Sequence, residues 1–131
     1  MSISVNELRA ENWILGEEIH LYNQNIHSNG YTKITAYGIY MLSENPELAA
    51  KYNPIPLTPD LLLACGFEPQ YDEDIVWHEL ELRAGPLLTE GDKNGKCEVF
   101  FDCFEKIRVQ HLHQLQNLYF ALVGKELDVK L

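Results

Sequence analysis

The stretch "VQHLHQLQNLYFALVG" (Val109–Gly124) contains no Asp, Glu, Lys or Arg, although the chain of 131 residues carries 10 basic and 20 acidic residues. Its apolar residues recur every three or four positions, which predicts an amphipathic helix over His111–Val123. On a helical wheel, six of these apolar residues lie within an arc of about 140°, and they form the face that is expected to point to the core. The residues of this face are Leu112, Leu115, Leu118, Tyr119, Leu122 and Val123. Gly124 follows at the position where a C-cap glycine ends a helix.

The opposite side of this helix is polar but uncharged. Its residues are His113, Gln114, Asn117 and Ala121, with Gln116 and Phe120 on the flank. Exposed helix faces usually carry Glu and Lys, whereas amides and imidazoles exchange hydrogen bonds without the large desolvation cost of a charge. This face is therefore expected to be covered, either by the chain itself or by another molecule. The predicted partner-contact residues are His113, Gln116, Asn117 and Phe120.

A second helix is specified by the segment "LTPDLLLACGF" (Leu57–Phe67). Thr58 is a favoured N-cap residue and Pro59 suits the first helical position. Gly66 supplies the left-handed residue that ends many helices. These signals predict a helix over Pro59–Cys65, which must be held by packing because about seven residues are too few for an isolated helix.

The segments before this helix are typical of strands. Residues 5–22 alternate apolar and polar residues over short stretches and predict two short strands, with Gly16 at the turn between them. Tyr31–Leu42 is rich in β-branched and aromatic residues and predicts a strand, with Gly38 at a bulge or bend. After Asn45, the segment "PELAAK" predicts a short helix that begins at a proline.

The segments after the second helix predict more sheet. "IVWHELEL" (Ile75–Leu82) alternates as a strand does. A hairpin-like segment follows, in which the turn "GDKNG" (Gly91–Gly95) joins "AGPLLTE" to "KCEVFFDCF". "EKIRV" can extend the sheet up to the last helix.

The sum of these elements predicts a single α+β domain over residues 1–131. Its sheet is expected to be mostly antiparallel, with the C-terminal helix packed on it and both helices on one side. Within the domain we expect an N-terminal β-module at about 1–44, a helical connection at 45–67, and a β-hairpin with the C-terminal helix at 68–131.

Three segments together carry a resemblance to a known family. They are "NELRAENWIL" (Asn6–Leu15), "PIPLTPDLLLACGF" (Pro54–Phe67) and "HLHQLQNLYFALVGKEL" (His111–Leu127). They resemble the "NELRxGNW", "PIPLTxxxLLxxCGF" and "HQLQNLYFALTGEEL"-like segments of small, uncharacterised bacterial and phage proteins. The resemblance implies an N-terminal β-module that is SH3-like, an α+β remainder and a phage or mobile-element origin, and it transfers no catalytic residue. The family usually has glycine before Asn-Trp, where this chain has Glu11.

Charge and composition exclude several classes of protein. The net charge of −10 disfavours direct nucleic-acid binding, because affinity for nucleic acid comes largely from neutralised phosphates. The apolar runs are only a few residues long, far short of the roughly 20 that span a bilayer. The N-terminus lacks the basic-then-apolar pattern of a signal peptide, which predicts a cytoplasmic protein. The odd number of cysteines, three, predicts reduced thiols there.

No motif indicates a catalytic, metal or cofactor site. Cys97, Cys103, His111 and His113 form C-x5-C-x7-H-x-H, which matches none of the usual zinc spacings. If both histidines are helical, their side chains point about 200° apart and cannot share an ion, and they can converge only if this segment is still a strand. We therefore predict no catalytic residues, no metal ligands and no cofactor.

The sequence favours a small cytoplasmic accessory or binding protein, phage- or mobile-element-related, that acts through contacts with a protein partner or a second copy. One alternative is a small hydrolase that uses His, Asp and Glu residues near 78–111, in particular His78, Asp102 and His111. The other is an acidic inhibitor that mimics nucleic acid, which requires carboxylates in spaced rows.

Overall fold

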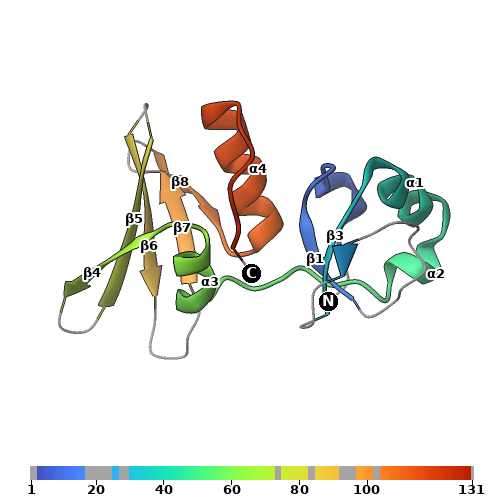
Figure 1. The fold of residues 1–131 in the computed structure, drawn as a ribbon, viewed down its shortest axis with the longest axis horizontal. Helices are drawn as coiled ribbons and strands as arrows, with labels where there is room; N and C mark the ends of the chain where they lie inside the picture. Colours follow the sequence, from blue (N-terminus) through green and yellow to red (C-terminus); the bar gives the residue numbers. More distant parts are fainter. Residues whose placement is uncertain are drawn as a thin grey trace. The chain divides into compact units, whose positions relative to one another are not determined.

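The computed structural model describes the backbone of most of the chain. The described residues are 3–16, 25–26, 30–72, 75–82, 85–91, 97–101 and 104–130, with side chains at 3–16, 30–67, 98–99 and 108–130. Within this part the protein has four α-helices, one 3-10 helix and two antiparallel sheets, so the predicted α+β class is confirmed (Figure 1). The chain divides into two compact units, Met1–Ile55 and Pro56–Leu131, and each is described by itself.

The first unit contains a small antiparallel sheet. Its strands are β1 (Trp13–Leu15), β2 (Asn25–Ile26) and β3 (Tyr31–Lys33), in the order β1-β3-β2. Thr32 of the central strand lies opposite Ile14 on one side and Ile26 on the other. The SH3-like barrel implied by the resemblance stays a prediction, because the described strands of this unit are only two or three residues long.

The prediction of two strands in residues 5–22 is only partly confirmed. The first described element there is η1, a 3-10 helix at Val5–Glu7, and β1 is the one strand among the described residues of this range. Residues 17–22 lie outside the described residues. Gly16 is needed for close packing, because a Cβ atom at this position would overlap the ring of buried Tyr52.

The prediction of one long strand over Tyr31–Leu42 is wrong beyond its first three residues. The helix α1 occupies Ala36–Glu44, and the hydroxyl oxygen of Thr35 accepts a hydrogen bond from the backbone N–H of Gly38 at 3.1 Å. Gly38 and Leu42, four residues apart, are the buried positions of the helix. The N-cap and a helical burial pattern therefore override the β propensity of the aromatic and β-branched residues.

A second short helix, α2 (Pro46–Ala49), follows immediately and begins at the predicted proline. The side chain of Asn45 does not cap α2. It donates instead to the carbonyl oxygen of Met41 at 2.8 Å, near the end of α1. Both helices pack around the core of this unit. The buried core residues are Ile3, Ile14, Ile34, Leu42 and Tyr52.

The second unit is built on a five-stranded antiparallel sheet in which sequence neighbours pair. The strands are β4 (Glu68–Asp72), β5 (Ile75–Leu82), β6 (Gly85–Gly91), β7 (Cys97–Phe101) and β8 (Phe104–Val109). The predicted strand at Ile75–Leu82 is confirmed, and β6 and β7 form the predicted hairpin, with Gly91 opposite Cys97. The turn residues 92–96 lie outside the described part.

The helix α3 (Pro59–Ala64) begins and ends at the predicted signals. The Thr58 hydroxyl oxygen accepts from the N–H of Leu61 at 3.2 Å, and Pro59 is the first helical residue. Cys65 is the C-cap residue, Gly66 has a φ of 94°, and the N–H of Phe67 reaches back to the carbonyl oxygen of Leu62 at 3.1 Å. The local sequence specifies both ends of this helix, and the buried residues Leu61 and Leu62 hold it by packing.

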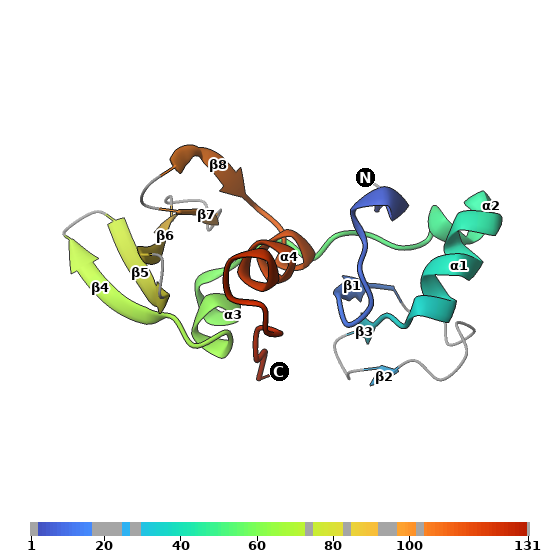
Figure 2. The ribbon, with the colours of Figure 1, turned by 90° about the horizontal axis from the view of Figure 1, so that it is seen from above.

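The C-terminal helix α4 (Leu112–Val123) is also confirmed, with His111 as its N-cap residue. It ends at Gly124, which has a φ of 78° and donates from its N–H to the carbonyl oxygen of Phe120 at 2.8 Å. Figures 1 and 2 show α3 and α4 on the same side of the five-stranded sheet.

Two backbone contacts connect the irregular segments of this unit. The N–H of Leu57 donates to the carbonyl oxygen of Gln110 at 3.0 Å, and the N–H of Lys130 donates to that of Ala64 at 2.8 Å. The predicted helical connection at 45–67 is divided by the boundary between the units, with α2 in the first and α3 in the second. The single domain over 1–131 stays a prediction.

Candidate protein-contact surfaces

Two polar residues in the first half of α4, one on the polar face and one on its flank, are buried. His113 and Gln116 are each only 2% exposed, and they are as inaccessible as their apolar neighbours Leu112 and Leu115. Two of the four predicted contact residues are thus covered in the structure. Uncharged side chains at these positions fit this burial, since a buried charge would cost far more than an amide or imidazole.

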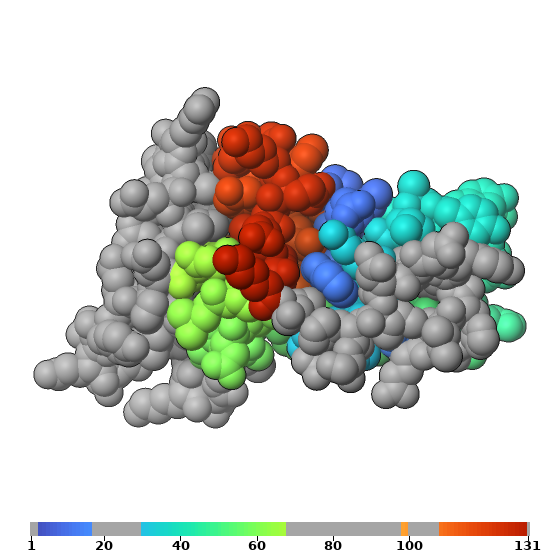
Figure 3. All heavy atoms as spheres, in the orientation of Figure 1, coloured from blue at the N-terminus to red at the C-terminus, as the bar shows by residue number. Residues whose placement is uncertain are grey.

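The second half of the same face is open to solvent. Phe120 is 39% exposed, Ala121 is exposed and Asn117 is partly exposed. Figure 3 shows atoms of the segment 109–130, in orange and red, at the surface in this view. Asn117 and Phe120 are therefore the predicted contact residues that remain accessible.

Gln114 has a structural role that the sequence interpretation missed. Its Oε1 atom accepts from the backbone N–H groups of Gln110 at 3.2 Å and His111 at 3.3 Å. The same oxygen lies 3.3 Å from Nδ1 of His111. The signal that could have revealed this is the spacing H-x-x-Q, because glutamine three residues after an N-cap residue commonly closes a capping box.

The two histidines at the start of α4 lie side by side, because the condition for a 200° separation, that both are helical, is not met. His111 is the N-cap residue and has an extended backbone, so the helical wheel does not describe it. Its ring stacks on that of His113, with centroids 6.1 Å apart and planes inclined by 23°. Among the described residues, no group of three or more His, Cys, Asp or Glu side chains could hold a metal ion.

The residues of the hydrolase alternative are only partly described. The backbone places His78 in β5, opposite Thr89 of β6. Asp102 and the side chain of His78 lie outside the described part of the chain. His111 is partly exposed at the start of α4. The hydrolase interpretation therefore stays a prediction, and so does the nucleic-acid mimic.

The thiol of Cys65 is buried and is expected to be unreactive. Cys65 is 3% exposed at the end of α3, and burial raises the pKa of its thiol from 9.0 to about 12. A nucleophilic cysteine needs a lowered pKa, because the thiolate is the reactive form. In this environment Cys65 acts as a small core residue.

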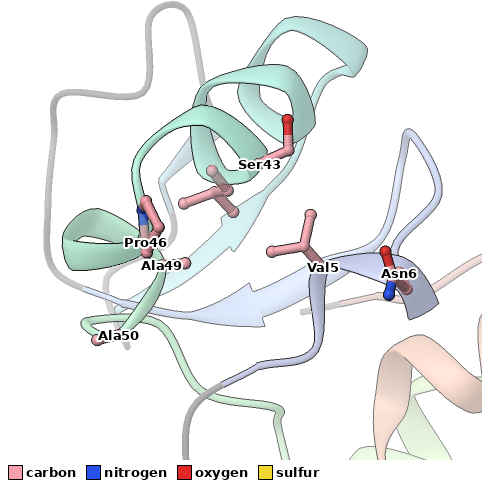
Figure 4. Close-up of a pocket in the computed structure, with 7 residues that line it drawn as sticks. Val5, Asn6, Ser43, Pro46, Ala49 and Ala50 are labelled. Carbon is pink, nitrogen blue, oxygen red and sulfur yellow. The ribbon is translucent and has the colours of Figure 1, made fainter.

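The first unit has a second candidate surface, which the sequence interpretation did not identify. A hollow of about 300 Å³ lies between η1 and the pair of helices α1 and α2 (Figure 4). Its lining residues are Val5, Asn6, Leu42, Ser43, Pro46, Ala49 and Ala50. Val5 of η1 and Ala49 of α2 point into it from opposite sides. Most of the lining is apolar, which is typical of a site for a hydrophobic side chain.

Two tyrosines of α1 are exposed, and in the sequence they lie a few residues before the lining residues Leu42 and Ser43. Tyr37 is 52% exposed and Tyr40 is 57% exposed, and their ring centroids lie 6.3 Å apart. The hydroxyl of Ser43, a lining residue one turn further along, donates to the carbonyl oxygen of Tyr40 at 2.7 Å. The hollow was missed because residues distant in sequence form it. The tyrosines were missed because α1 was predicted as a strand.

Both surfaces belong to a chain in which no described helix is long and apolar enough to span a membrane. One surface is the uncharged end of α4, and the other combines an apolar hollow with exposed tyrosines on α1. Comparisons with protein-family models, with curated proteins and with solved structures gave no match.

Proposed function

We propose that this protein is a small accessory or binding protein that acts through protein–protein contacts, and that the exposed end of α4 is its contact surface. We define this surface by Asn117, Phe120 and Ala121. One observation carries the proposal. In a chain with a net charge of −10, this exposed helix face is uncharged and presents a partly exposed phenylalanine.

The chemistry of the surface favours a protein partner. A partner that covers Asn117, Phe120 and Ala121 removes no ion from water, so the desolvation cost is small. The Phe120 ring supplies apolar area that is still available for burial, and Asn117 can both donate and accept hydrogen bonds. Aromatic residues next to neutral contacts are typical of the centre of an interface.

The resemblance supports the biological setting of the proposal. The segments Asn6–Leu15, Pro54–Phe67 and His111–Leu127 favour a phage- or mobile-element-related protein that works in the bacterial cytoplasm. The third of these segments contains the proposed contact surface, so the residues that carry the resemblance are in part those that carry the proposed contact.

The proposal is tested by affinity capture with the tagged full-length chain from a bacterial lysate, followed by mass spectrometry. The variant Phe120→Ser is compared with Leu63→Ser, because Leu63 on α3 is 47% exposed and provides a matched control. We expect the wild type and Leu63→Ser to retain the same partner. Phe120→Ser should lose about 2 kcal/mol of binding free energy, roughly 30-fold in affinity.

Self-association is measured in parallel by sedimentation equilibrium. If a dimer is found and Phe120→Ser dissociates it, the partner is a second copy of the chain. The proposed surface is wrong if Phe120→Ser and Leu63→Ser retain the same partners and the same solution mass as the wild type.

A further inference from the structure

Several residues that line the hollow of the first unit have an exposed glutamate as their neighbour in the sequence. Glu7, Glu44 and Glu47 are exposed, and each is next in sequence to a lining residue. Glu44 and Glu47 form no ion pair within the described part of the chain. Lys51 is the one basic residue next to a lining residue in the sequence. The sequence neighbours of the lining residues therefore carry an excess of negative charge.

The interior of the hollow has a different character. Leu42 is buried beneath it, and Val5 and Ala49 are partly buried and pack against the core of the unit. A volume of about 300 Å³ is at the small end of ligand sites and is enough for one large aliphatic or aromatic side chain. An apolar lining whose sequence neighbours are exposed carboxylates fits an apolar side chain with cations on either side of it.

The exposed tyrosines of α1 add a second feature that favours cations. Tyr40 is one turn before Ser43 on α1, and about half of the surface of both Tyr37 and Tyr40 is exposed. A Lys ammonium or an Arg guanidinium is attracted to the face of a tyrosine ring as well as to a carboxylate. Both features therefore select the same kind of partner.

From this geometry we infer that the first unit binds a basic peptide segment, with one apolar side chain in the hollow between η1 and α1–α2 and Lys or Arg residues against Glu44, Glu47 and the tyrosines. This site is separate from the proposed contact surface on α4. It gives the chain a second binding surface, specific for a positively charged protein segment.

The test uses the full-length ¹⁵N-labelled chain and a synthetic nine-residue peptide. The probe has one central leucine, two Lys or Arg residues on each side, and glycine at the remaining positions. Two further peptides change the leucine to serine, or the basic residues to glutamine. We expect the probe to shift the amide resonances of the hollow and of α1, and each altered peptide to bind about tenfold more weakly.

Variants of the chain distinguish binding at the hollow from a general attraction of the basic peptide to the negatively charged protein. The pair Glu44→Gln and Glu47→Gln should weaken binding of the probe about fivefold. The pair Glu126→Gln and Asp128→Asn changes the net charge equally at exposed positions of the second unit, and should change affinity less than twofold. Ala50→Leu, at an exposed lining residue, should fill the hollow and weaken binding about tenfold, with circular dichroism as the check on folding.

Three outcomes would overturn the inference. The first is equal binding of the serine peptide, which would indicate attraction to charge alone. The second is equal binding of the glutamine peptide, which would indicate an apolar hollow without selection for cations. The third is a result that does not localise binding to the hollow. This would be an equal loss of peptide affinity in the Glu44/Glu47 and the Glu126/Asp128 variants, or amide resonance shifts that are spread over both units.

Discussion

The backbone at Glu11 gives a prediction that can be worked through in detail. Glu11 has a φ of 80°, and it is the one non-glycine residue with positive φ in the described chain. It is the third residue of a turn in which the N–H of Asn12 donates to the carbonyl oxygen of Arg9 at 3.1 Å, and the Asn12 side chain accepts from the Arg9 N–H at 2.7 Å. The left-handed conformation costs a residue with a Cβ atom about 1 kcal/mol.

The side chain of Glu11 recovers part of this cost. Its carboxylate lies 2.9 Å from Nζ of Lys33, but the two side chains are 52% and 36% exposed. An ion pair with this exposure contributes about 0.5 kcal/mol. Glu11→Ala should therefore destabilise the chain by about 0.5 kcal/mol, because it loses the pair and keeps the strain. Glu11→Gly should be more stable than Glu11→Ala by about 1 kcal/mol, and thus slightly more stable than the wild type.

Urea unfolding monitored by circular dichroism measures these differences. Lys33→Met provides the matched background, since it removes the ion pair without touching the turn. In that background, Glu11→Gly should stabilise the protein by the full 1 kcal/mol or so. The reasoning is refuted if Glu11→Gly is no more stable than Glu11→Ala in either background.

Four further predictions concern packing, backbone conformation, pH and capping. Gly16→Ala should destabilise by more than about 2 kcal/mol in thermal melts, because the new methyl group meets the ring of buried Tyr52. Gly124→Ala, with φ at 78° and open space around it, should cost only about 1 kcal/mol. The thiol of Cys65 keeps its proton up to a pKa of about 12, whereas the unfolded thiol ionises near 9.0. Stability should thus be unaffected by this group below pH 9 and fall by about 1.4 kcal/mol per pH unit between the two values. Cys65→Ala should lower overall stability but flatten this alkaline decline in urea titrations, and an equally steep decline would contradict the assignment. Gln114→Ala should cost about 1 kcal/mol by removing the acceptor for two backbone N–H groups, whereas Gln114→Glu, which keeps an acceptor, should retain or raise the melting temperature.

The elements predicted correctly from the sequence are those in which every local signal agrees. For α3, Thr58, Pro59 and Gly66 each specify an end of the helix, and the structure uses all three. The end of α4 at Gly124 and the strand β5 are of the same kind. Such signals act within a few residues of the backbone they control, so a single sequence contains them in full.

The failures occur where packing decides between competing local preferences. In α1, only Thr35 marked a helix start, against a run of aromatic and β-branched residues that favour a strand. Burial of Leu42 in the core decides the outcome, and this depends on residues far away in the chain. The hollow beside η1 has the same origin, since its walls come from residues about forty positions apart.

The burial of the uncharged side of α4 could be predicted only in part. The absence of charge correctly marked a face with unusual surroundings, but composition could not tell that His113 and Gln116 are buried while Phe120 is exposed. Gln114 and His111 show a further limit. A helical wheel assumes that every residue is helical, and the N-cap residue is not.

The residues after Gly124 have a practical consequence for shortening the chain. The end of α4 is a natural place to truncate, because the helix is complete there. However, Leu127 is only 7% exposed. In addition, the N–H of Lys130 donates a hydrogen bond to the carbonyl oxygen of Ala64, near the end of α3. A chain stopped at Gly124 would uncover apolar surface and leave that carbonyl to water. Such a chain would aggregate more readily, and its altered behaviour would reflect a damaged fold and not a lost binding site.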